Sequence, residues 1–345
     1  MSSDKQLQYF SNPNTDFLKA TPIHFLESLE GPVVIDITGT DTSRTRVFTT
    51  LIHGNEPSGL IAFHQWLLEL TVSHQLPSTN IRIIVPSIEA ALCKPVFTTR
   101  FIEGYKDLNR CFGSSDGSCE QTLLANEIEL AIRDVAPEAI IDMHNTSGSS
   151  PAFSVAIKSD DSEKNLAAFF CNQLIHTQIR LGALMELDFN CPIVTIECGG
   201  SEDAISSKRA YQGIKQITEL SDLKLELEND TVDVFNQPIR VQLNQGLSLA
   251  YSDSDIVEHS LVLSADNELR NFGVTHKETF LGWIKGSCSE TLTAYNHQGE
   301  NVCGELFHVA HGKLYTSKEL NFFMATDSAR IAAADCLFYV TEIAC

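Results

Sequence analysis

Hydrophobic residues in the first two-thirds of the chain form two kinds of pattern. Short continuous runs predict buried strands, and longer runs with apolar residues every three or four positions predict helices. The predicted strands cover residues 33–38, 46–52, 81–85, 139–143 and 193–196, and the predicted helices cover 57–70, 120–135, 162–179 and 202–217. Between 85 and 112 we expect a long irregular segment. Strands that alternate with helices predict an α/β fold with a mostly parallel sheet covered on both faces.

The pattern changes after about residue 220. Short β-type runs follow, at 239–243, 247–251, 260–264, 279–284 and 291–294, and turn signals such as 244–246 separate them. We therefore expect a large α/β domain over residues 1–222 and a smaller β-rich domain over 223–345. The acidic stretch 226–233 is the expected linker.

Composition and charge exclude several classes of binding partner. The hydrophobic share is 43% and the formal net charge is −21, which describes a globular protein whose surface repels phosphate backbones and anionic lipids. Nucleic-acid and membrane partners are therefore not expected. The ten cysteines form no C-x-x-C pair, so we interpret them as reduced, buried residues. The start of the chain is polar and no apolar run could span a bilayer, so we expect a cytoplasmic protein.

Three predicted strands end on residues that could carry chemistry. The first runs into His53 and Glu56, the second into His144 and the third into Glu197. In α/β sheets ligands bind beyond the carboxyl ends of the strands, so these distant positions can meet at one edge. A single histidine or glutamate at a strand end is usually only a solvated polar residue, but here three strand ends supply what one reaction needs.

Two imidazoles and one carboxylate form a common catalytic zinc set that leaves a coordination position for water. His53 and Glu56 are three residues apart, and Gly54 allows the tight turn that would aim both at one ion. We predict that His53, Glu56 and His144 bind one Zn²⁺ and that Glu197 is the general base.

The irregular segment contributes Arg100 and then Asp107-Leu108-Asn109-Arg110. Long loops in compact domains tend to be functional, and neighbouring Asn109 and Arg110 could bind a carboxylate. A surface salt bridge is the alternative for such an arginine. A second alternative is the G-x-S-x-G pattern at 113–117 with Ser115 as nucleophile, but it lacks the strand before it and the helix directly after it that a serine hydrolase needs.

Four ordered motifs resemble those of the succinylglutamate desuccinylase and aspartoacylase family, whose catalytic fold is shared with the zinc carboxypeptidases. They are His53-Gly54-Asn55-Glu56, Asp107-Leu108-Asn109-Arg110, Asp142-Met143-His144-Asn145-Thr146 and Ile196-Glu197-Cys198-Gly199. The domain plan, a carboxypeptidase-like domain followed by a β-rich one, is also similar.

The resemblance implies a role at each matching position. His53, Glu56 and His144 match the zinc ligands, Glu197 the general base, and Arg100 the arginine that polarises the scissile carbonyl. Asn109 and Arg110 match the pair that grips a substrate carboxylate. Where aspartoacylase has an arginine ten residues before its base, this chain has Leu187, and Arg180 is the nearest arginine upstream.

These residues predict a zinc amidohydrolase that cleaves a small, anionic N-acyl amino acid such as N-succinylglutamate. A zinc carboxypeptidase acting on peptides is one alternative, because it uses the same metal and base. A non-catalytic metal-binding protein of the same fold is another, although its site would not need the general base. A serine hydrolase that uses Ser115 is the weakest alternative.

Overall fold

The computed structural model describes residues 6–114, 117, 119–146, 148–223, 232–296, 298–334 and 336–343. Ser115 and positions 226–231 of the expected linker lie outside these residues. The chain divides into two compact units. The first consists of Met1–Asn145, Ala152–Leu174 and Arg180–Val234, and the second of Thr146–Pro151, Ile175–Ile179 and Phe235–Cys345. The boundary expected at 222/223 remains a prediction.

A nine-stranded sheet organises the first unit, in the order β1-β2-β4-β3-β5-β8-β6-β7-β9. The sheet is mixed: β3 is parallel to both β4 and β5, whereas β2 pairs antiparallel with β4 and β6 with β8. Its strands are β1 Gln8–Ser11, β2 Val33–Ile37, β3 Asp41–Thr50, β4 Thr79–Val85, β5 Ala139–Thr146, β6 Phe153–Ala156, β7 Gln173–His176, β8 Ile193–Gly200 and β9 Asp233–Asn236.

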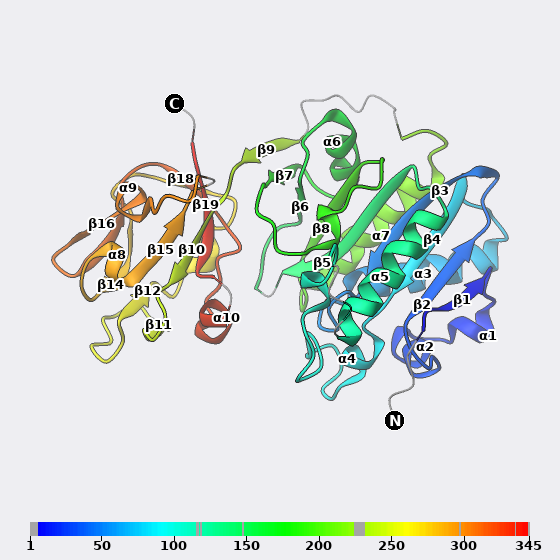
Figure 1. Ribbon diagram of the computed structural model, residues 1–345, viewed down its shortest axis with the longest axis horizontal. Helices are drawn as coiled ribbons and strands as arrows, with labels where there is room; N and C mark the ends of the chain where they lie inside the picture. Colours follow the sequence, from blue (N-terminus) through cyan, green and yellow to red (C-terminus); the bar gives the residue numbers. More distant parts are fainter. Residues whose placement is uncertain are drawn as a thin grey trace. The chain divides into compact units, whose positions relative to one another are not determined.

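Helices cover both faces of this sheet, as the alternating pattern predicts. One apolar cluster joins the sheet to α1 Thr15–Leu18, α2 Pro22–Glu27, α3 Ser58–Ser73, α6 Asp161–Ala168 and α7 Ala204–Glu219. A second cluster packs α5 Glu120–Asp134 against the opposite face (Figure 1). Successive side chains of a strand point to opposite faces of the sheet, so Phe48 of β3 packs in the first cluster and its neighbour Val47 packs in the second. No described helix is long and apolar enough to cross a membrane.

The carboxyl ends of β3, β5 and β8 meet at one edge of the sheet. Thr50 of β3 pairs with Met143 of β5. At the start of β5 the N–H of Ile140 donates to the Pro192 carbonyl, and at its end the side chain of Asn145 donates to the Gly199 carbonyl. β8 therefore runs alongside β5 in the same direction. This register brings together the segments that follow the three strands.

The second unit is rich in β structure, as expected. It contains two five-stranded sheets, ordered β13-β18-β19-β10-β15 and β11-β12-β14-β17-β16, around one apolar core. The strands are β10 Ile239–Leu243, β11 Leu249–Tyr251, β12 Leu261–Leu263, β13 Val274–Thr275, β14 Phe280–Ile284, β15 Leu292–Tyr295, β16 Phe307–Ala310, β17 Lys313–Thr316, β18 Leu320–Phe323 and β19 Phe338–Glu342. Short helices α8 Cys288–Thr291, α9 Cys303–Leu306 and α10 Ala329–Ala334 lie among them.

Two predictions of secondary structure were wrong in part. The helix expected over 162–179 ends as α6 at Ala168, and residues Gln173–His176 form strand β7. Phe170 packs closely against Gly213 of α7, and Leu174 joins the buried core, so tertiary contacts outweigh the helical spacing. The segment expected to be irregular also contains the short helix α4 Ile88–Leu92 and the 3₁₀ turn Leu108–Arg110.

Candidate metal centre and active site

A tight turn after β3 presents His53 and Glu56. Leu51 adopts a positive φ of 57°, which turns the chain out of the strand. Gly54 lies so close to its neighbours that an added Cβ would fall 2.5 Å from the Ala91 nitrogen, so no larger residue fits. The N–H of Gly54 donates to the carbonyl of Arg100 at 2.9 Å. The turn is thereby attached to the loop that carries Arg100.

His53, Glu56 and His144 converge as predicted. One ligand atom from each lies within 4.8 Å of the others, and all three residues are buried. Nδ1 of His144 is 2.6 Å from Oε2 of Glu56, and Nδ1 of His53 is 2.9 Å from Oε1 of the same carboxylate. Three buried groups able to coordinate a cation therefore share one small volume.

The far nitrogen of each imidazole is held by an aspartate. Nε2 of His53 is 2.9 Å from Oδ1 of Asp107, and Nε2 of His144 is 2.9 Å from Oδ2 of Asp142. A carboxylate in this position fixes the tautomer and orientation of an imidazole and leaves its other nitrogen free to bind a metal. Both rings therefore present Nδ1 toward Glu56.

Charge coupling inside the cluster is strong. Burial alone would raise the pKa of Glu56, but His53 and His144 outweigh it and hold this pKa well below its usual value. Burial alone would lower the pKa of His144, but Asp142 and Glu56 hold it well above its usual value. The carboxylates thus favour positive charge at this point, and a divalent cation could supply that charge in place of protons.

Glu197 has a different environment. Burial of its carboxyl group raises its pKa to about 7, against the opposing influence of His144 and Arg100. Its Oε2 is buried, and no group in the described part of the chain donates a hydrogen bond to it. A carboxylate with a pKa near neutrality, beside a candidate metal centre, is suited to accept and return a proton.

Arg100 reaches the same cluster from the loop. Its Nη1 donates to Oε1 of Glu56 at 3.0 Å and its Nε donates to Oδ2 of Asp107 at 3.1 Å. Partial burial opposes its charge, but these two carboxylates raise the pKa of Arg100 above its usual value. A guanidinium therefore lies directly beside the candidate ligands, on a side chain that remains 36% exposed.

Asn109 and Arg110 follow Asp107 in the same loop but differ in exposure. Asn109 is buried and its Oδ1 accepts a hydrogen bond from the N–H of Leu184 at 3.1 Å, which leaves its amide nitrogen as the side-chain donor for a ligand. Arg110 is exposed, and its Nη1 donates to the carbonyl of Asn109. Arg110 therefore has guanidinium donors left for an anion.

Three further residues of the site, Asp107, Asp142 and Asn145, lie within the quoted motifs but have no role among the sequence-based predictions. Asp142 precedes His144 by two positions on β5, and this spacing places both side chains on one face of the strand. Asn145 joins three segments: its Oδ1 accepts from the Ser58 N–H, and its Nδ2 donates to the Ser58 Oγ and the Gly199 carbonyl. The strand period could have indicated Asp142, but the contacts of Asp107 and Asn145 depend on the tertiary fold.

The donor set fits a zinc ion. Two imidazole nitrogens and one carboxylate are ligands that Zn²⁺ prefers, and both imidazoles carry the supporting carboxylates typical of such sites. Nδ1 of His53 is buried and lacks a hydrogen-bonding partner of suitable geometry among the described residues. A coordinated cation would satisfy this atom.

The comparison with known protein families agrees with this geometry. The family model of the succinylglutamate desuccinylase/aspartoacylase catalytic domain matches residues 44–202, which include all seven predicted site residues. Residues 44–202 of the chain therefore match the succinylglutamate desuccinylase/aspartoacylase family. No curated protein sequence matches the chain.

Members of this family are also similar in structure. The succinylglutamate desuccinylase of Vibrio parahaemolyticus has 12% identity and a TM-score of 0.62, over 94% of this chain and 96% of that chain. Murine aminoacylase 3 has 14% identity and a TM-score of 0.55, over 88% and 96%. The succinylglutamate desuccinylase/aspartoacylase of Rhodobacter sphaeroides has 13% identity and a TM-score of 0.55, over 90% and 88%. At these identities the likeness establishes the shared fold.

Leu187, which occupies the position where aspartoacylase has an arginine, packs beside an apolar cluster of the first unit. Its Cδ2 would lie 3.2 Å from a Cβ added at Gly113. This position therefore offers an apolar contact and no positive charge.

Proposed function

We propose that this protein is a zinc-dependent amidohydrolase that cleaves the amide bond of a small, anionic N-acyl amino acid. The observation that carries the proposal is the convergence of His53, Glu56 and His144 beside a half-buried Glu197 whose pKa is raised to about 7. One group of residues would hold the metal and another would move the proton. The match of residues 44–202 to the desuccinylase and aspartoacylase family supports the same reaction class.

His53, Glu56 and His144 would hold one Zn²⁺ per chain, with Asp107 and Asp142 orienting the imidazoles. Zinc in such a site lowers the pKa of water and polarises a carbonyl. Glu197 takes a proton from the attacking water as its oxygen bonds to the acyl carbon. Glu197 then returns this proton to the amide nitrogen as the C–N bond breaks, which releases a carboxylate and a free amino acid.

Arg100 and Arg110 supply the positive charge that such a substrate needs. Arg100 would stabilise the negative charge that develops on the carbonyl oxygen, a contribution worth roughly 3–4 kcal/mol for one well-placed donor. Arg110, with the amide nitrogen of Asn109, would bind a carboxylate of the substrate. The chain as a whole has a net charge of −21 and repels anions, so these two arginines would supply the local positive charge that attracts an anionic substrate.

The decisive experiment combines metal analysis with amine release. We expect about one zinc per chain, and release of amino acid from one or more of N-succinylglutamate, N-acetylaspartate and N-acetyl aromatic amino acids. Release should stop on chelation and return with zinc. Cleavage confined to amino-blocked dipeptides would identify a carboxypeptidase instead. Zinc without any hydrolysis would indicate a binding protein, and absence of metal after preparation with zinc would overturn the proposal.

A further inference from the structure

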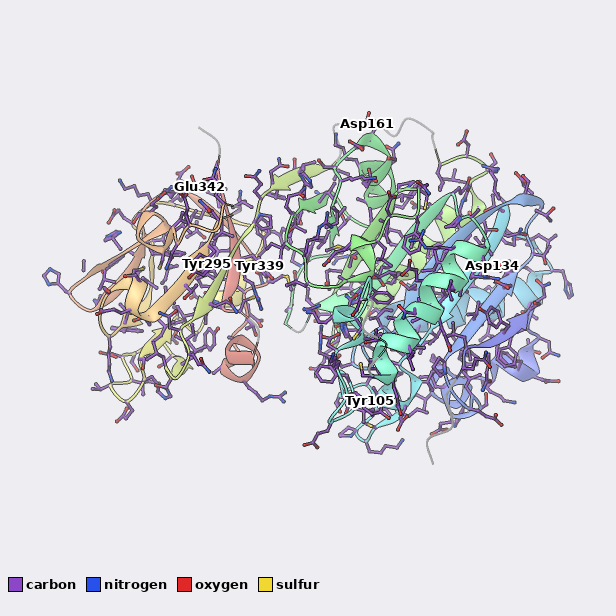
Figure 2. All side chains as sticks on the ribbon, viewed as in Figure 1. Tyr105, Asp134, Asp161, Tyr295, Tyr339 and Glu342 are labelled. Atoms are coloured by element: carbon purple, nitrogen blue, oxygen red, sulfur yellow. The ribbon has the colours of Figure 1, made fainter. Side chains whose placement is uncertain are left out.

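The first unit contains a groove that is separate from the metal centre. Its volume is about 1050 Å³, and α4, α5, the loop around Phe101 and the segment that leads into β2 form its walls. None of the four residues assigned to zinc and the general base lines it. Tyr105, which is labelled in Figure 2, is part of its wall.

Much of the lining of the groove is apolar, although polar side chains such as Gln121 and Asn126 also contribute. Leu92, Phe101, Ile102, Leu123, Leu124 and Leu130 line it. Several of these are far more exposed than core residues: Leu130 is 66% exposed, Leu123 is 49% exposed and Phe101 is 39% exposed. Leu123 and Leu130 are seven positions apart on α5, so they lie on one side of the helix two turns apart. Exposed apolar groups gathered in one place mark interaction surfaces, whereas isolated ones do not.

All the charged side chains that line the groove in the described part of the chain are acidic. Glu30, Glu89, Glu120 and Glu127 line it, and no lysine, arginine or histidine in the described part of the chain does so. Glu120 accepts a hydrogen bond from the Tyr105 hydroxyl, and Glu127 accepts one from the N–H of Leu7, so neutral groups contact these two carboxylates. An occupant must therefore be apolar on the side it buries and cationic at its edges.

We propose that this groove binds a basic amphipathic peptide segment of a partner protein, with an apolar face on α5 and lysine or arginine side chains toward the glutamates. The size of the groove is at the upper end of small-ligand pockets, which suits a peptide. An exposed helix side of this kind is matched by a second amphipathic helix. Anionic lipid is repelled by the acidic rim, and a second copy of a chain with net charge −21 has the wrong sign.

A labelled model peptide tests the proposal. The probe is an 18-residue fluorescent peptide with leucines on one helical face and lysines on the other, and the control peptide has the same charge with serines in place of the leucines. We expect the leucine peptide to bind the intact protein and the serine peptide to bind at least 10-fold more weakly. Hydrogen exchange should slow in residues 120–134 when the leucine peptide is bound.

Matched variants locate the binding. Leu123→Ser/Leu130→Ser and Glu30→Gln/Glu120→Gln should each weaken binding about 10-fold or more, since each removes one kind of contact. The controls are Val72→Ser/Leu76→Ser, which changes two apolar residues 73% and 57% exposed elsewhere on the same unit, and Glu258→Gln/Glu305→Gln on the second unit. Both controls should leave binding within twofold of the original.

Three outcomes would overturn the proposal. Equal loss of binding in the Glu258→Gln/Glu305→Gln control would show general attraction to an acidic surface. Failure of the leucine peptide to bind, with folding of every protein verified by circular dichroism, would remove the groove as a peptide site. Self-association of the protein in sedimentation experiments, abolished by Leu123→Ser/Leu130→Ser, would assign the groove to a second copy.

Discussion

The two units of the chain both have an apolar core, but they bury different polar groups. In the described part of the chain, every buried aspartate, glutamate, histidine, lysine or arginine lies in the first unit; examples are Glu56, Asp142 and His144. The buried polar residues of the second unit are neutral, such as Asn267, Thr275 and Thr316. Burying a charge is costly unless it is paired, so charges are retained where a pairing or a reaction needs them. The reaction chemistry that we propose therefore belongs to the first unit.

A second contrast lies within the first unit, between two buried charge clusters. Near the start of β5, Arg46 pairs with Glu138 at 2.6 Å and donates to the carbonyls of Ile217 and Leu220 at the end of α7. This arginine caps a helix, and its contacts explain its presence. Toward the carboxyl end of β8, Glu197 has a buried carboxylate oxygen, Oε2, without a described hydrogen-bond partner. In the first cluster Nη2 of Arg46 also has no described partner, but Nε and Nη1 contact only a carboxylate and two carbonyls of the protein. The second cluster adds what a cation would need, two imidazoles and a carboxylate within 4.8 Å of one another.

The largest effect should come from removing the proton acceptor. Glu197→Gln keeps the size of the side chain but cannot take a proton, so kcat should fall by about 10³-fold or more while zinc content is unchanged. Steady-state kinetics and metal analysis on the same sample check both expectations. Loss of zinc together with activity would show instead that Glu197 holds the metal site together.

The next largest effect should appear in stability. Arg46→Met removes a buried charge that caps α7, and we expect the free energy of unfolding to fall by about 3–5 kcal/mol. Arg133→Met breaks the pair with Glu129 on α5, where Arg133 is 41% exposed, and should change stability by less than about 1 kcal/mol. Denaturant unfolding measures both. If the Arg46→Met variant also lost affinity for zinc, the separation between the two clusters would be wrong.

Asp142→Asn should have an intermediate effect on the metal. The amide oxygen can accept a hydrogen bond from Nε2 of His144 but lacks the negative charge of the carboxylate, so we expect zinc affinity to fall about 10–100-fold. Competition with a fluorescent chelator measures this change. Asp36→Asn, which weakens the structural pair with Arg82 at 2.7 Å, is the control and should leave zinc affinity unchanged.

The smallest effect should be confined to substrate binding. Arg110→Ala removes the exposed guanidinium, and we expect KM to rise about 10-fold while kcat changes little, because a charge-assisted contact contributes roughly 1.5–3 kcal/mol. Lys106→Ala, on an exposed residue of the same loop, is the matched control. A KM unchanged by Arg110→Ala would remove this residue from the carboxylate site.

Much of this arrangement was predictable from local patterns. The alternation of apolar runs predicted β3, α3, β5, α5, β8 and α7 to within a few residues, because each element buries one face with its own period. The helix predicted over 162–179 was wrong at β7, where a place between β6 and β9 in the sheet outweighs a helical spacing. Helix α4, which is only five residues long, was not predicted.

The sequence by itself determined the residue types and the strand ends at which they occur. His53, His144 and Glu197 each follow a recognisable apolar run, and in an α/β sheet that position predicts a shared site. Only the tertiary structure decided how these groups are supported. The contacts of Asp107 with His53, of Asn145 with Ser58 and Gly199, and of Asn109 with Leu184 join segments far apart in the chain. Such contacts depend on the register of neighbouring strands and on the path of one loop, and no local pattern of hydrophobic residues encodes either.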